Sequence, residues 1–115
     1  ASEERLDISR RSMLRAPPAI AVISSPKDRP TGTPVWEQEL SVGAACHDLR
    51  LAANAAGIAG CWLSEWVVFS DGINDLLGLQ GNERVAGFIY LGTATGEPQE
   101  RMRPDAAERI SHWQG

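Results

Sequence analysis

The most constraining feature of this 115-residue chain is a long helical pattern that runs from residue 35 to residue 56. Its apolar residues recur three and four positions apart, as on one helix face, and Gly57 follows as a natural helix stop. The stripe is wide and rich in alanine, and Gly43 interrupts it. We therefore expect a helix that is enclosed by other elements and closely approached by one of them. The apolar positions are Val35, Trp36, Leu40, Val42, Ala45, Cys46, Leu49, Ala52, Ala53 and Ala56.

Three short segments have the character of β-strands. Residues 19–25 are β-branched and almost continuously apolar, which predicts a central strand buried on both faces. Residues 58–66 predict a strand that runs into a loop, and residues 84–92 give the strongest strand pattern of the chain. Because three short strands make a thin sheet, we expect it to belong to a larger unit or to be completed by a partner subunit.

The remaining segments are two shorter helices, a loop and a tail. Residues 2–15 combine a serine N-cap with an acidic first turn and a basic last turn, and residues 70–79 predict a short capped helix closed by Gly78 or Gly81. Proline at every fourth position makes residues 26–34 a surface loop. The polar tail from Thr93 has a helical pattern only over residues 105–113. This order of elements favours one mixed α/β or α+β domain.

Composition excludes several classes of protein. A net charge of -4 and a pI near 5.1 argue against nucleic acid or an anionic membrane as the main partner. Cys46 and Cys61 are too few for a disulfide-stapled domain and lack zinc-site spacing, so we expect reduced thiols in the cytoplasm. We find no membrane span and no signal peptide. The chain opens on Ala1 rather than Met, which fits removal of a tag, proteolysis or a start within a longer protein.

The sequence offers only weak candidates for a catalytic acid, base or nucleophile. Cys46 and His47 are adjacent on a helix and point about 100° apart, so they do not form a catalytic dyad; a buried thiol beside a surface histidine is expected instead. His112 lies in the polar tail without a nucleophile and an orienting carboxylate around it. Glu37 and Glu39 face different directions and are expected to act as helix-start charges.

The strongest candidate for anion binding is Arg101-Met102-Arg103. In an extended segment, alternation places both guanidinium groups on one side, which matches the fork geometry that binds phosphate. The alternative is a solvated charge pair that faces Glu97 and Glu100. Three of the four tryptophans are also notable in so short a chain, and they suit either a planar ligand or core and interface packing. They are Trp36, Trp62 and Trp66.

Four segments together resemble the flavin-dependent nitroreductase family. They read VWEQELSVGAAC (35–46), LAANAAGIAGCWLSEW (51–66), VAGFIYLGT (85–93) and RMRPD (101–105). The resemblance covers nearly all of this chain but only the C-terminal portion of the family domain. It implies an α+β, nitroreductase-like fold of three layers, with a central sheet and flanking helices, incomplete at its N-terminus, in which residues 1–115 are the C-terminal portion of a single domain.

The resemblance also implies a function. Members of the family are homodimers that bind FMN at the subunit interface and transfer hydride from NAD(P)H to a nitro, quinone or related acceptor by ping-pong turnover. The cofactor performs the chemistry, so no catalytic acid or base is expected from the protein, and no metal. The long helix would be the central dimer helix, with Gly43, Ala44 and Ala45 permitting close approach.

Cofactor-binding residues follow from the positions that match the family. Trp62, Leu63 and Ser64 match the strand-to-loop segment that lies against the flavin ring, and Glu65 is adjacent to it. Arg101 and Arg103 match the basic pair on the FMN phosphate. Arg10-Arg11-Ser12 resembles a second family phosphate site in composition only, because it lies too close to the first strand to occupy the same place.

Two other functions of the chain remain as hypotheses, one of a binding module and one of a different kind of enzyme. One is a truncated, cofactor-free dimerisation or interaction module derived from the same family. The other is a thiol enzyme that uses Cys46 or Cys61, which would require a reactive thiolate.

Overall fold

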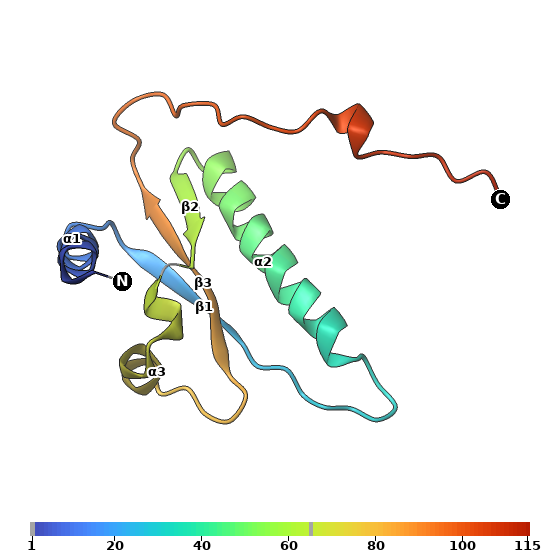
Figure 1. The fold of residues 1–115 in the computed structure, drawn as a ribbon, viewed down its shortest axis with the longest axis horizontal. Helices are drawn as coiled ribbons and strands as arrows, with labels where there is room; N and C mark the ends of the chain where they lie inside the picture. Colours follow the sequence, from blue (N-terminus) through green and yellow to red (C-terminus); the bar gives the residue numbers. More distant parts are fainter. Residues whose placement is uncertain (1, 65) are drawn as a thin grey trace.

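The structure is a computed structural model that describes residues 2–64 and 66–115. Helices and strands alternate along the chain (Figure 1). The helices are α1 (Glu3–Leu14), α2 (Val35–Ala55) and α3 (Asp71–Leu77), and the strands are β1 (Ala19–Ser24), β2 (Ala59–Leu63) and β3 (Arg84–Gly92). Two 3-10 turns, η1 (Trp66–Phe69) and η2 (Ala106–Glu108), stand after β2 and in the C-terminal tail.

The sheet is antiparallel, and β3 lies between β1 and β2. The strand predicted over residues 84–92 is confirmed with the same bounds. The prediction that residues 19–25 form a central strand buried on both faces is wrong, because β1 lies at an edge and Ile20 remains 42% exposed. A continuous apolar run indicates the character of two faces, but it carries no information about neighbours in the sheet.

α2 packs along one face of the sheet, and α1, η1 and α3 lie on its other side (Figure 1). The centre of the packed side is formed by Cys46 of α2 and Ile89 of β3, both fully buried, and by Val85, which is 5% exposed. This three-layer α+β arrangement confirms the fold class expected from the sequence.

Local signals fixed the helix ends well. Ser2 Oγ accepts a hydrogen bond from the Arg5 N–H at 3.3 Å, as an N-cap does. Gly57 follows α2 with a φ of 77°, and Gly78 closes α3 with a φ of 68°. Both angles lie in the left-handed region that glycine adopts at little cost, so each residue ends its helix as predicted.

The chain exposes far more surface than a self-sufficient domain of its mass. Its accessible area is 9568 Å², whereas a folded monomer of 12.4 kDa should expose about 6,100 Å². Its radius of gyration is 17.6 Å, against about 13 Å for a compact chain of this length. The enclosure predicted for α2 is therefore not found in the single chain: Trp36 and Leu40 are 64% exposed and Leu51 is 52% exposed.

Residues 93–115 form an extended tail that leaves the sheet and runs past the C-terminal end of α2 (Figure 1). Its regular structure is limited to η2, so the helix suggested over residues 105–113 shrinks to a single turn. Within the described residues, no helix combines the length and the apolar character that crossing a membrane requires.

Candidate functional site

Trp62 is the best-anchored residue of the expected cofactor segment. Its side chain lies on the α2 face of the sheet, where the indole Nε1–H donates to the Ala86 carbonyl at 3.3 Å. The ring covers Gly87 so closely that a Cβ there would collide with indole Nε1 and Cδ1. On its other side, a Cβ at Gly43 would stand 3.9 Å from Cη2 of the ring, so this indole is the close approach predicted for Gly43. Trp62 thus fixes the end of β2 through its side chain.

Leu63 lies on the opposite face of the sheet from Trp62, because side chains alternate along a strand. Together with Cys61 and Tyr90 it lines a cleft of about 680 Å³ between the sheet and α1. From the α1 side, Arg11, Ser12 and Arg15 line the same cleft, with further apolar lining from Ile8, Ala16 and Pro17. The residues that line the cleft are therefore mostly apolar, with two arginines and one serine on the α1 side.

Ser64 marks the point where the chain leaves the sheet. The last sheet pair of β2 is Leu63 with Phe88, and Ser64 follows it as an exposed residue outside regular structure. Among the described residues, no backbone hydrogen bond holds Ser64. Its main-chain groups and small side chain are therefore available beside the Leu63 end of the cleft. Glu65, the fourth residue of the expected segment, lies outside the described residues.

Arg101 and Arg103 stand apart from this segment within the single chain. β2 runs antiparallel to β3, so Leu63 is at one end of the sheet and Gly92, where the tail begins, is at the other, paired with Ala59. Both arginines are exposed in the tail. Arg103 Nε lies 2.6 Å from Glu100 Oε1 in an exposed ion pair, which is part of the charge pairing considered as the alternative to phosphate binding.

The two thiols differ in their exposure to solvent. Cys46 is fully buried, and this burial raises the pKa of its thiol, which keeps it protonated and unreactive. His47 beside it is exposed, as the helical spacing predicted. Cys61 is a free, exposed thiol in the cleft. The described residues hold no cluster of histidine, cysteine or acidic side chains suited to a metal ion.

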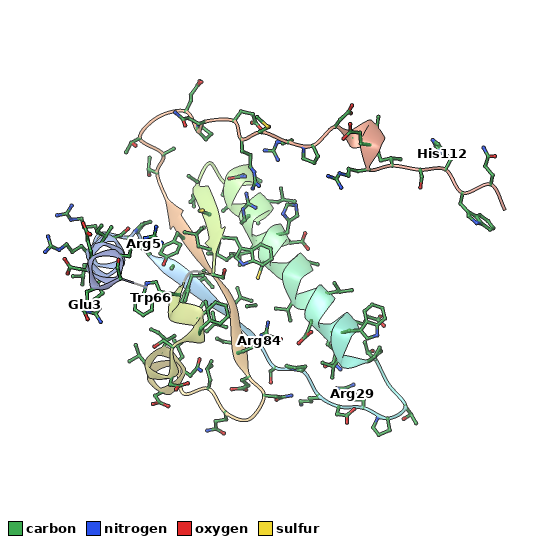
Figure 2. The ribbon with its side chains drawn as sticks, in the orientation of Figure 1. Glu3, Arg5, Arg29, Trp66, Arg84 and His112 are labelled. Carbon is green, nitrogen blue, oxygen red and sulfur yellow. The ribbon has the colours of Figure 1, made fainter. Side chains whose placement is uncertain are left out.

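Two features of the site were not foreseen from the sequence. Gly87 makes room for the Trp62 indole, and a lone glycine inside a strong strand pattern is the signal that indicates such a close approach. Arg11 and Arg15 line the cleft, but no local pattern shows which side of α1 faces the sheet. His112, in contrast, lies exposed far out on the tail as expected (Figure 2).

Comparison with known proteins agrees with this architecture. The family model described as the nitroreductase family matches residues 2–93. A protein of Escherichia coli K12, provisionally named NAD(P)H nitroreductase YdjA, is 33% identical over 91 residues, which are 79% of this chain and 49% of that protein. A protein of Haemophilus influenzae, provisionally named NAD(P)H nitroreductase, is 31% identical over 101 residues, 88% of this chain and 55% of its own length.

A solved structure has the same fold. The nitroreductase-like family protein from Bacillus cereus superposes with a TM-score of 0.78 at 22% identity, and the match covers 100% of this chain and 62% of that one. The chain thus spans about half the length of the curated relatives it matches. On the family match and these relatives, the chain belongs to the nitroreductase family.

Proposed function

We propose that the chain contributes to an FMN-dependent NAD(P)H oxidoreductase, with the flavin ring against the carboxyl end of β2. The observation that supports this best is that β2 ends beside the cleft with the main-chain groups of Ser64 outside the hydrogen-bonded sheet. A flavin needs a flat apolar wall and main-chain donors near its ring nitrogens. Leu63 and Ser64 are of the right kind to supply them.

The residues of this segment have different tasks in the proposed site. Leu63 supplies apolar surface, and Ser64 supplies main-chain groups and room, because its side chain is small. The Trp62 side chain packs on the face of the sheet that α2 covers, so we assign it the positioning of β2 rather than contact with the flavin. When bound, FMN supplies the redox chemistry, in which hydride from NAD(P)H passes to a nitro, quinone or related acceptor in alternating turnover.

Arg101 and Arg103 are the proposed phosphate ligands, and the length of the tail permits this. The nine residues that follow Gly92, up to Arg101, can span up to about 30 Å when extended. The sheet between Ala59 and Leu63 is only about 13 Å long at the usual rise per residue. The tail is therefore long enough to return to the Leu63 end of its own sheet, at the expense of the exposed Arg103–Glu100 pair.

A second copy of the chain is the proposed partner. Trp36, Leu40 and Leu51 are spaced four and eleven residues apart, which places them on one side of α2, and all three are more than half exposed. The excess of surface over a compact monomer, about 3,400 Å², is larger than the roughly 800 Å² that each partner buries in a standard interface. Part of that excess belongs to the extended tail. We also propose a cytoplasmic location, on the basis of the two free cysteines.

The second candidate function is a cofactor-free dimerisation or interaction module. It is favoured by the separation of the tail arginines from the end of β2 within one chain. Both candidates predict a dimer, so the oligomeric state does not separate them. Binding of FMN separates the two candidate functions, because only the oxidoreductase requires it.

The experiment is an absorbance spectrum of the purified chain, followed by an FMN titration monitored by quenching of flavin fluorescence. Saturable binding is expected for the oxidoreductase. The double variant Arg101→Gln/Arg103→Gln should weaken it by about tenfold or more, since charge-assisted hydrogen bonds are lost. The control Arg10→Gln/Arg29→Gln removes the same charge from other exposed sites. No binding at high FMN would support the cofactor-free module, and equal weakening by both double variants would refute the phosphate assignment.

A further inference from the structure

His47 stands on the exposed side of α2, among the apolar residues that a second copy of the chain would cover. It follows Leu40 by seven residues and precedes Leu51 by four, spacings that place all three side chains on one side of a helix. Leu40 and Leu51 are more than half exposed in the single chain, and His47 is exposed between them. An imidazole therefore interrupts the uncovered apolar stripe of α2.

No carboxylate of α2 is placed to hold a protonated His47. The residues three and four positions away, which are its neighbours on the helix surface, are Gly43, Ala44, Arg50 and Leu51. Asp48 follows directly and points about 100° away. Arg50 is itself a cation, and its buried Nε has no hydrogen-bond partner among the described residues. A protonated imidazole would thus gain no ion pair on its own helix and would have a second positive charge one turn away.

The sheet under α2 offers no countercharge either. Only Arg84, at the start of β3, is a charged residue among the three strands. Cys46, the titratable group next to His47, is fully buried on the sheet side of α2. Cys61 and Tyr90 are titratable as well, but they line the cleft on the opposite face of the sheet.

The loop before α2 and the tail after β3 are the remaining charged segments near this helix. The loop is tied to α2 at Gln38, nine residues or about 14 Å along the helix from His47. Its charged residues are Lys27, Asp28 and Arg29. The tail runs past the C-terminal end of α2 (Figure 1). Its charged residues are Glu97, Glu100, Arg101, Arg103, Asp105, Glu108 and Arg109. Within the described residues, no hydrogen bond or ion pair joins the His47 imidazole to any of them.

The two charge states of an imidazole differ in what they cost in an apolar interface. The neutral ring has one donor and one acceptor, whereas the protonated ring is a cation that loses its water when it is covered. Histidine changes between these states in the range from pH 5 to pH 8. An interface between two identical faces contains each of its residues twice, so a dimer through α2 would cover two such rings.

We propose that His47 makes the association of two chains through α2 sensitive to pH, so that the dimer forms with neutral imidazoles and dissociates when they are protonated. This inference rests on the dimer of the proposed function and adds its regulation. The sign follows from proton binding: the separated chains bind protons at His47 more readily than the dimer, so a lower pH favours the separated chains.

Sedimentation equilibrium at about pH 7.5 and about pH 5.5 measures the dissociation constant of the dimer. Each proton taken up on dissociation changes this constant by up to about tenfold per pH unit, so two protons give a dimer about tenfold to a hundredfold weaker at the lower pH. His47→Gln keeps a neutral polar side chain and should remove most of this difference. His112→Gln is the matched control, because it removes the other histidine, which lies exposed on the tail, and the difference should persist (Figure 2).

Circular dichroism at both pH values verifies that each chain stays folded. A dimer of equal strength at both pH values would overturn the proposal, and so would a dimer that tightens in acid or a His47→Gln variant as sensitive to pH as the parent. All three results leave the dimer itself standing. A parent chain that is monomeric at both pH values would instead refute the dimer of the proposed function, and this inference with it.

Discussion

The Trp62 indole packs directly against the backbone of Gly87, where no other residue type leaves room for it. The indole occupies the space where a side chain at residue 87 would begin, and its Nε1–H is fixed by the Ala86 carbonyl. The α2 face of the sheet accommodates this large ring because glycine stands on both sides of it, Gly87 in β3 and Gly43 in α2. The ring thus contributes, beside the pairing of β2 with β3, to the position of Leu63 at the end of β2 and of Ser64 after it.

We therefore predict that Gly87→Ala destabilises the chain by about 1–3 kcal/mol, because the new Cβ collides with the Trp62 ring. Urea unfolding measures the change. Gly96→Ala is the matched control, since a Cβ there meets nothing within 4 Å, and its effect should lie within about 0.5 kcal/mol. Adding Trp62→Leu to Gly87→Ala should restore part of the loss. Equal effects at residues 87 and 96 would show that the ring does not pack as described.

At the scale of elements, the loop between β1 and α2 is fixed by one side chain of the helix. Gln38 Oε1 accepts from the Lys27 N–H at 2.9 Å, and its Nε2 donates to the Lys27 and Thr33 carbonyls, both at 2.8 Å. These three hydrogen bonds tie the two ends of the proline-rich loop to the first turn of α2. A loop without regular structure thereby gains a fixed course.

Gln38→Ala should release this loop while leaving α2 intact. We expect the Lys27 amide to exchange with solvent about fivefold to tenfold faster, because its hydrogen bond is lost. Hydrogen exchange followed by NMR measures this rate. Gln99→Ala, in the exposed tail, should not change it. An unchanged Lys27 rate in the Gln38 variant would mean that the prolines alone hold the loop.

Most element boundaries that were predicted correctly had a clear local signal in the sequence. The bounds of β3, the glycine stops at Gly57 and Gly78 and the Ser2 cap all follow from side-chain periodicity or backbone preference. The edge position of β1 did not, because strand order is set by contacts between distant segments. The resemblance to the family indicated Leu63 and Ser64 as candidate site residues. It did not indicate that Arg11 and Arg15 line the same cleft as Leu63, because this cleft is formed by segments that lie far apart in the sequence.

The whole molecule exposes an unusually large surface for its size. A chain with three strongly buried apolar side chains in its described part, and with Trp36, Leu40 and Leu51 exposed along α2, buries little apolar surface by itself. Hydrophobic burial is the main favourable contribution to folding, so we predict that association adds to the stability of such a chain. The sequence pattern of α2 is that of an enclosed helix, and only another chain or segment can enclose it.

The proposed dimer makes this argument testable through a single position. Leu40→Glu places a charge on the exposed side of α2. Leu40 is 64% exposed in the single chain, so the monomer should tolerate a charge there. If α2 is covered by a second copy, the same charge is buried and the dimer dissociates. Light scattering should then give about twice 12.4 kDa for the parent chain and the monomer mass for the variant. Leu76→Glu on α3 is the control, because Leu76 is 79% exposed and lies away from α2, and that variant should stay dimeric. A monomeric parent, or a Leu40 variant that remains a dimer, would place the partner on another surface of the molecule.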